Sequence, residues 1–156
     1  MRKPYFDSIL LIERLHRYFL EVVKVQLDRM GVQDVNNVQA LILYNIAEDE
    51  LTVGELTARG YYLGSNVSYN VKKLVENKYL EQERSTHDRR SIRVKLSQKG
   101  LDLVARIGKL FDKQSADLDK AGVKEQDLAK INEVLQRVER YWQMSMDYSS
   151  MAAIAI

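Results

Sequence analysis

The chain has 156 residues, of which 46% are hydrophobic and 29% are charged, and its formal net charge is +2. This length suffices for one packed domain, and a single proline with only seven glycines favours helices. The lack of cysteine excludes disulfides, thiolate zinc sites and thiol redox switches. The histidines, His16 and His87, have no neighbouring metal ligands, so we expect neither metal nor cofactor. Charged residues interrupt every long apolar run and no secretion signal is visible, which predicts a cytoplasmic protein that binds no membrane.

The first third of the chain predicts two helices. From Tyr5 to Met30, opening near Pro4, apolar residues recur every three or four positions, and Gly31 follows as a stop signal. The second helix is expected to start with Asn36 or Asn37 as its N-cap and to run through Ile46. The first of these helices is long and amphipathic, so it needs a surface to cover its apolar side.

The segment that follows predicts a helix-turn-helix. Thr52 and Glu55 form a T-x-x-E capping box, in which each side chain accepts a hydrogen bond from a free N–H at the start of a short helix, about 53–59. A glycine-bounded turn over residues 60–64 comes next. Ser65 is then a suitable N-cap for a second helix, whose inward side is expected to carry Val67, Val71, Leu74 and Val75.

After residue 77 the apolar period shortens to that of strands. Residues 79–84 and 92–96 predict a two-stranded hairpin, and the seven polar residues of the loop between them must face solvent or a polar partner. Ser97 is expected to cap another helix that ends near Gly122. A last helix is predicted over about 125–148, and we expect the closing residues 149–156 to be a frayed tail rather than an apolar turn laid on a partner.

Together these elements predict a mainly α fold with a small β-hairpin wing. We expect one domain over residues 1–156, with a winged helix-turn-helix lobe at about 36–100 and dimerisation helices at about 4–31 and 101–148. The terminal helices would form a stalk, whose apolar seam a second copy would extend by two-fold symmetry. The sequence therefore predicts a homodimer.

Positive charge gathers in the predicted lobe. Residues 51–100 hold ten Lys or Arg against five Asp or Glu, a surplus of five that indicates a phosphate-binding module. In a helix-turn-helix the second helix offers its polar side to base edges in the major groove. Here that side holds the predicted recognition residues Ser65, Asn66, Ser68, Tyr69, Lys72 and Lys73. The alternative reading, a solvated face of an ordinary surface helix, loses weight because the surrounding elements come in the order that a winged module needs.

The predicted wing is rich in arginine. Its candidate DNA-binding residues are Arg84, His87, Asp88, Arg89, Arg90 and Arg93, and Lys95 follows on the returning strand. Five side chains that are positively charged at neutral pH surround one acid, which indicates a polyanionic partner. The planar guanidinium groups of the arginines among them suit a narrow minor groove. Asp88 would hold an arginine in position, or would simply be an exposed acid in a turn.

Four motifs carry a resemblance to a known family. They are T-x-x-E-L at 52–56, S-N-V-S at 65–68, L-x-x-x-x-Y-L at 74–80 and D-R-R-x-x-x-V-x-L-S-x-x-G at 88–100. The chain resembles the MarR (multiple antibiotic resistance regulator) family over nearly its whole length. The resemblance implies a homodimeric winged-helix regulator, here taken as a repressor, which binds a pseudo-palindromic site on double-stranded DNA and is released by a small molecule.

Matched by position, Arg90 falls at the minor-groove arginine of the family and Asp88 at its supporting acid. Three departures stand out. Lys78 replaces the usual glycine at a helix end, Tyr69 and Asn70 replace an Arg or Thr and an aliphatic residue, and Lys124 replaces a Ser or Thr cap.

An effector pocket has no fixed motif in this family. Candidate lining residues for an aromatic or lipophilic effector are His16, Phe19, Tyr44, Tyr61 and Tyr62, although ordinary packing would explain each of them. Two rival functions were weighed. One is a winged helix that binds protein in place of DNA, and the other is an enzyme, for which the sequence offers no catalytic residues or motif.

Overall fold

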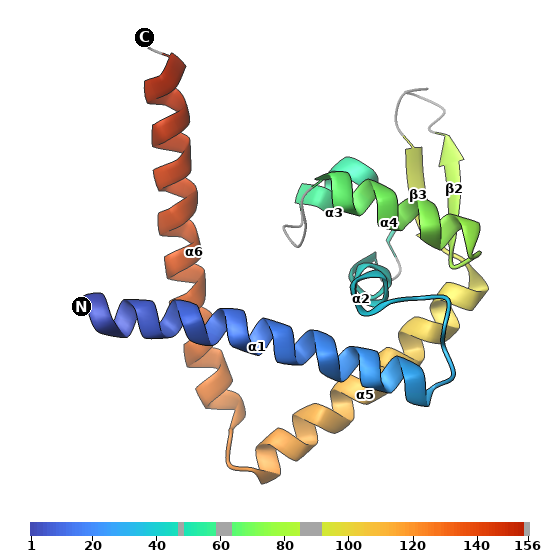
Figure 1. Cartoon of the computed structure of the whole chain (residues 1–156), viewed down its shortest axis with the longest axis horizontal. Helices are drawn as coiled ribbons and strands as arrows, with labels where there is room; N and C mark the ends of the chain where they lie inside the picture. The colour runs from blue at the N-terminus through green and yellow to red at the C-terminus, as the bar shows by residue number, and fades with distance from the viewer. Residues whose placement is uncertain (47–48, 59–63, 85–91, 155–156) are drawn as a thin grey trace. The chain divides into compact units, whose positions relative to one another are not determined.

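The computed structural model describes residues 1–46, 49–58, 64–84 and 92–154 of the chain (Figure 1). The elements follow one another as α1 Arg2–Arg29, α2 Asn37–Ile46, β1 Leu51–Thr52, α3 Val53–Ala58, α4 Gly64–Glu76, β2 Leu80–Arg84, β3 Ile92–Leu96, α5 Gln98–Lys120 and α6 Glu125–Ile154. This confirms a mainly helical fold with a small winged sheet. The chain divides into two compact units, Met1–Lys109 and Leu110–Ile156, and the division falls within α5.

The first two helices begin and end where local chemistry satisfies their backbone. Gly31, at φ +72°, closes α1, and the N–H groups of Gly31 and Val32 bond back to the carbonyls of Asp28 and Leu27. This paired pattern is a Schellman motif, which needs a left-handed residue that glycine adopts without strain. At the start of α2, Asn36 proves to be the N-cap.

The sheet has one strand more than the sequence predicted. Its order is β1-β3-β2, and both pairings are antiparallel, with Leu51 opposite Val94 and Leu80 opposite Leu96. Strand β1 is too short to show an alternating pattern, so the prediction of a two-stranded hairpin was incomplete. The capping box is confirmed directly after β1, since Thr52 N donates to Glu55 Oε2 at 2.7 Å and Glu55 N donates to Thr52 Oγ1 at 3.1 Å.

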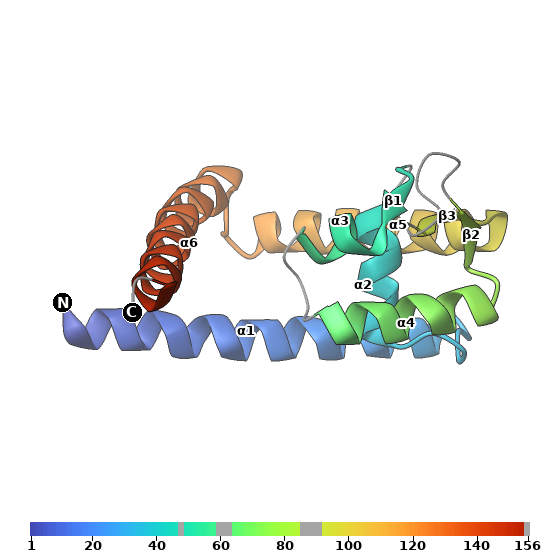
Figure 2. The ribbon, with the colours of Figure 1, turned by 90° about the horizontal axis from the view of Figure 1, so that it is seen from above.

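The core of the first unit lies between α2, α4 and the sheet, and both ribbon views show α4 beside these elements (Figures 1 and 2). The largest fully buried side chains of this unit are Val23, Ile42, Leu43, Ile46, Val67, Leu74, Val94 and Ile107. Helix α4 begins at Gly64, one position before the predicted cap Ser65, a difference within the usual uncertainty of helix ends. Val67, Val71 and Leu74 are buried as predicted, whereas Val75 is only half-buried.

Helix α4 ends on a strained residue. The N–H groups of Lys78 and Tyr79 bond to the carbonyls of Val75 and Leu74, which is again the Schellman pattern, but here the left-handed position is held by Lys78 at φ +62°. The departure noted in the sequence therefore carries a strain cost, because a side chain in this region costs about 1–2 kcal/mol.

The start of α5 is fixed against the end of α4. Ser97 caps α5, as predicted, because its Oγ accepts a hydrogen bond from Gly100 N at 3.1 Å while it donates to the carbonyl of Lys78 at 2.7 Å. A Cβ on Gly100 would lie 2.3 Å from the carbonyl oxygen of Tyr79. Position 100 therefore has no room for any side chain unless the backbone moves.

A polar cluster joins the α1–α2 connection to the same region. Asp34 accepts hydrogen bonds from the Tyr79 hydroxyl and from Lys99 Nζ, both at 2.8 Å, and Lys99 Nζ also lies 3.9 Å from the centre of the Tyr79 ring. Partial burial works to raise the pKa of Asp34, but the hydrogen bonds from Lys99 and Tyr79 outweigh it and hold this pKa below its ordinary value. The ionised form of Asp34 is thus the form that stabilises the fold.

The second unit consists of the end of α5 and the whole of α6. Gly122, at φ +94°, closes α5, and Lys124 N donates to Asp127 Oδ2 at 3.0 Å, so Asp127 caps the start of α6 although Lys124 has no capping oxygen in its side chain. Helix α6 continues to Ile154, so the prediction of a frayed tail from residue 149 was wrong for the backbone. Methionine and alanine in this stretch favour a helix. None of the helices described is both long and apolar enough to cross a membrane.

Replacing Lys78 with glycine should stabilise the protein by about 0.5–1 kcal/mol, because the relief of left-handed strain exceeds the entropy cost of glycine. Chemical denaturation, followed by circular dichroism, would measure this gain. The matched control is Lys72→Gly in the exposed middle of α4, which should cost about 1 kcal/mol. A loss of stability in both variants would show that Lys78 is not strained.

Replacing Asp34 with asparagine should cost about 1 kcal/mol at neutral pH, most of it from the hydrogen bond that the Tyr79 hydroxyl donates to a charged acceptor. Since the folded-state pKa lies below the unfolded value of 3.8, this contribution is complete above that pH and is lost as the pH falls through the folded pKa. Melting temperatures of the two proteins should therefore converge in strong acid. A gap that stays constant down to pH 2 would contradict this role of the carboxylate.

Candidate nucleic-acid interface

The polar side of α4 is open to solvent. Asn66, Ser68, Tyr69 and Lys72 are exposed, with Tyr69 at 60% of its full area. The opposite side of the same helix is buried in the core, which fixes the direction in which these four side chains point. The helix therefore presents a projecting polar surface, as the sequence predicted, although the side chain of the candidate Ser65 lies outside the described residues.

Lys73, the last of the predicted recognition residues, is engaged within α4. Its Nζ lies 2.7 Å from Glu76 Oε2, one helical turn further on. This hydrogen bond raises the pKa of Lys73 and lowers the pKa of Glu76. Because both side chains are well exposed, the pair contributes little to stability and can open to a competing phosphate. A phosphate contact by Lys73 stays a prediction.

The wing is described only at its base. Arg84 ends β2, and Arg93 lies on β3 opposite Glu83, partly exposed. The side chain of Arg84 and the whole of His87, Asp88, Arg89 and Arg90 lie outside the described residues. Their predicted role at the tip of the wing is therefore untested.

The base of the wing carries acids that the sequence reasoning left out of its charge count. Lys95 Nζ lies 2.7 Å from Glu83 Oε1 and 3.8 Å from Glu81 Oε2, both on β2. The hydrogen bond to Glu83 raises the pKa of Lys95. The interpretation of five firm charges around a single acid was wrong, because Lys95 is compensated by the neighbouring strand. Alternation along β2 places both acids on one face, but only the register between β2 and β3 brings Lys95 to them.

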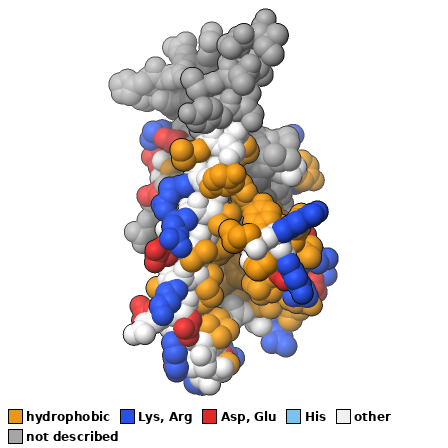
Figure 3. All heavy atoms as spheres, turned by 90° about the vertical axis from the view of Figure 1, so that its left-hand side faces the viewer, with side chains coloured by type: hydrophobic (Ala, Val, Ile, Leu, Met, Phe, Trp, Pro, Cys, Tyr) orange, Lys and Arg blue, Asp and Glu red, His pale blue; other side chains and the backbone are white. Residues whose placement is uncertain are grey.

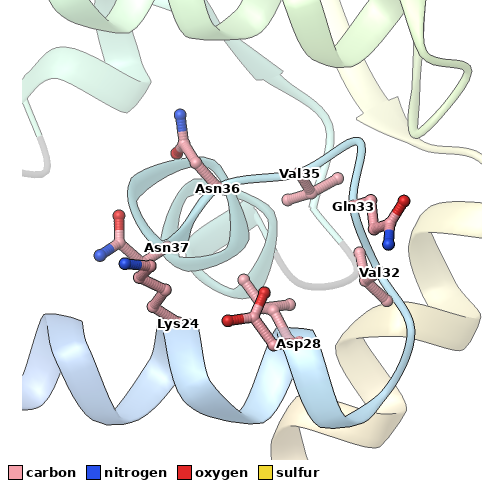
Figure 4. A pocket seen from close by; sticks show the side chains of 8 residues that line it. Lys24, Asp28, Val32, Gln33, Val35, Asn36 and Asn37 are labelled. Atoms are coloured by element: carbon pink, nitrogen blue, oxygen red, sulfur yellow. The ribbon is translucent and has the colours of Figure 1, made fainter.

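The predicted effector residues are not shown to form one site. His16 is exposed, Phe19 and Tyr44 are 38% and 37% exposed, and Tyr61 and Tyr62 lie outside the described residues. A pocket of about 280 Å³ opens elsewhere, between the end of α1 and the start of α2 (Figure 4). Its lining residues are Lys24, Leu27, Asp28, Val32, Gln33, Val35, Asn36 and Asn37. Of the candidates that the structure describes, His16, Phe19 and Tyr44, none is among them.

Two buried polar residues were given no role from the sequence, although Asn70 was noted there in place of an aliphatic residue. Gln39 on α2 and Asn70 on α4 are only 6% and 8% exposed, and Gln39 Nε2 donates to Asn70 Oδ1 at 3.2 Å. The available signal was the position of Asn70 between the apolar residues Val67, Val71 and Leu74, on the side that faces the core. These residues link the candidate interface to the helix below it.

Comparison with known proteins agrees with this arrangement. A family model described as "MarR family" matches residues 33–91. The chain is also 36% identical, over 138 residues, to the exopolysaccharide II synthesis transcriptional activator ExpG of Rhizobium meliloti (strain 1021), and the match covers 88% of this chain and 71% of that protein.

Solved structures share the fold at low sequence identity. FabT of Streptococcus pneumoniae in complex with DNA has a TM-score of 0.68 at 20% identity, covering 89% of this chain and 97% of that one. The MepR–DNA complex of S. aureus has a TM-score of 0.72 at 18% identity, covering 85% and 96%. The regulator SlyA has a TM-score of 0.77 at 13% identity, covering 91% and 98%.

Proposed function

The chain belongs to the MarR family, and from that membership we propose that it acts as a homodimer at a promoter, where two copies of α4 enter successive major grooves about 34 Å apart. The family consists of transcriptional regulators, so this chain is a DNA-binding regulator and not an enzyme. Its site is pseudo-palindromic, because a two-fold protein reads two equivalent half-sites. A regulator of this kind acts in the cytoplasm.

The observation that carries the proposal is the exposed polar surface of α4. The major groove admits a helix and distinguishes all four base pairs by their donors and acceptors. Asn66 and Ser68 can donate to and accept from base edges, Tyr69 adds an aromatic face with a hydroxyl, and Lys72 can reach a phosphate. Tyr69 takes part in a preference specific to this chain, because the family commonly has Arg or Thr there.

The wing supplies the second part of the interface. Arg90, at the position of the family's minor-groove arginine, enters the groove beside the half-site, and Arg89 binds phosphate or shares that groove. A narrow minor groove has an enhanced negative potential that favours guanidinium groups. Arg84 and Arg93 add positive charge to the wing, His87 adds a polar ring, and Asp88 orients an arginine.

The dimer is supported by apolar surface that the single chain leaves open. On α1 the exposed large apolar residues are Tyr5, Phe6, Leu10, Leu11, Ile12, Leu15, Tyr18, Phe19 and Val25, and on α6 they include Leu128, Ile131, Val134, Leu135, Tyr141, Trp142, Met144 and Met146. Figure 3 shows hydrophobic side chains open to solvent on the face that it draws. Surface of this kind usually marks an interface, and a second copy would cover it by symmetry.

An effector controls the proposed regulator by favouring its DNA-free form. An aromatic or lipophilic molecule that bound this form more tightly would shift the population away from DNA. The five candidates His16, Phe19, Tyr44, Tyr61 and Tyr62 remain predictions for its site. We propose that the protein represses transcription. Because the relative is named an activator, a reporter assay with and without the protein decides between repression and activation.

The proposed function is tested by comparing Tyr69→Ala with Arg90→Ala. Loss of Tyr69 should weaken binding to a selected operator more than binding to a random duplex, because base contacts carry the preference. Loss of Arg90 should weaken binding to both duplexes by about 1–3 kcal/mol while the dimer stays folded. Fluorescence anisotropy on the two duplexes would measure both effects.

The same titrations across a salt series separate this function from the rival protein-interaction module. Phosphate contacts require a steep linear fall of log K with log salt. The absence of retention on any duplex at low salt would rule out the regulator. Equal losses on operator and random DNA for Tyr69→Ala would rule out base reading by this residue.

The acids at the base of the wing should restrain DNA affinity. Replacing Glu81 and Glu83 together with glutamine frees Lys95 from its ion pairs, and the log K against log salt slope should steepen by about one as this lysine gains a phosphate. The matched control is Asp117→Asn, which frees Lys120 at the end of α5, outside the proposed interface, and should leave the slope unchanged. An unchanged slope in the double variant would place Lys95 away from the DNA.

A further inference from the structure

A chain of hydrogen bonds connects α2 to the backbone of the recognition helix. Asn36 N donates to Gln39 Oε1 at 3.0 Å, Gln39 Nε2 donates to Asn70 Oδ1 at 3.2 Å, and Asn70 Nδ2 donates to the carbonyl of Asn66 at 2.8 Å. Gln39 N also donates to Asn36 Oδ1 at 2.8 Å, which completes a reciprocal cap. This chain of hydrogen bonds through Gln39 and Asn70, here called the relay, ends at the carbonyl of Asn66. The side chain of Asn66 is a proposed base contact.

The direction of the relay is fixed at both ends. At α2 the backbone N–H of Asn36 can only donate, so the oxygen of the Gln39 amide must face it. At α4 the carbonyl of Asn66 can only accept, so the nitrogen of the Asn70 amide must face it. The remaining Gln39 nitrogen and Asn70 oxygen are then complementary. A flip of either amide would break two hydrogen bonds, so the pair specifies one arrangement.

Because the Gln39–Asn70 pair is buried, it favours one orientation of α4 on α2. Gln39 and Asn70 are nearly inaccessible to water, and no buried side-chain polar atom among the described residues lacks a partner. Any rotation or slide of α4 on α2 would leave buried amide groups unpaired, at a cost that apolar neighbours do not impose. Apolar contacts alone hold two helices together while tolerating small shifts, whereas this hydrogen-bonded pair does not.

We propose that Gln39 and Asn70 are positioning residues, which set the orientation of α4 and thereby the sequence preference of the protein. The proposal rests on the proposed function, in which α4 reads bases. Neither side chain touches DNA. They act through the backbone at Asn66, because a small rotation of α4 would misalign the exposed side chains with base edges while phosphate contacts adapt.

The decisive test compares thermal stability with preference for a selected operator over a random duplex of the same length. Gln39→Glu keeps the cap on Asn36 but cannot donate to Asn70, so the preference should fall roughly tenfold or more. Gln39→Met alone should lower the melting temperature, because Asn70 Oδ1 stays buried without a donor. Gln39→Met with Asn70→Leu should regain most of that stability but not the preference, since two apolar side chains pack without fixing an orientation.

The control for stability alone is Ile107→Val, a buried change on α5 outside the relay, which should lower the melting temperature and leave the preference intact. The salt dependence of binding should stay unchanged in every relay variant. A double variant with the wild-type preference would overturn the inference, and so would an equal loss of preference in Ile107→Val. If the wild-type protein itself binds operator and random DNA equally, the proposed function falls and takes this inference with it.

Discussion

The carbonyl of Tyr79 is the point on which the arrangement of the first unit depends. It accepts a hydrogen bond from the backbone N–H of Ser97 at 3.0 Å and lies 3.1 Å from the Ser97 hydroxyl, whose single hydrogen it shares with the nearer carbonyl of Lys78. Gly100 packs against it so closely that no Cβ fits. Tyr79 itself follows directly after the left-handed Lys78. The end of α4, the edge of the sheet and the start of α5 therefore meet at one peptide group. A change in the direction in which the chain leaves α4 would therefore shift strands β2 and β3.

Features that depend on neighbours in the chain could be predicted from the sequence. The capping box of Thr52 and Glu55, the N-cap at Ser97 and the buried side of α4 all follow from residues within one or two helical turns. The strain at Lys78 was visible as a missing glycine. What the sequence did not reveal depends on contacts across the fold. Strand β1 exists only because β3 lies beside it.

The candidate site divides in the same way. The exposed face of α4 followed from helical spacing, whereas the ion pairs of Lys95 required the register between two strands. The Gln39–Asn70 contact joins positions 31 residues apart, and neither residue alone signals the other. Composition suggested a surplus of positive charge on the wing, but the structure shows that part of it is compensated at the base. The uncompensated positive charge of the hairpin therefore belongs mainly to the arginines of its loop.

In the proposed function, this distribution of charge assigns DNA affinity and base preference to different side chains. Asn66, Ser68 and Tyr69 carry no formal charge, so the exposed face that we propose reads bases adds little long-range attraction for DNA. Attraction must come from lysines and arginines around it, of which Lys73 and Lys95 first have to leave a carboxylate. Exposed ion pairs of this kind are weak and exchange readily with phosphate. In the proposed complex, exposed charges around this face set the binding strength, whereas the uncharged side chains Asn66, Ser68 and Tyr69 set the base preference through the orientation of α4. A buried amide pair suits that second task, because it acts on geometry without adding charge.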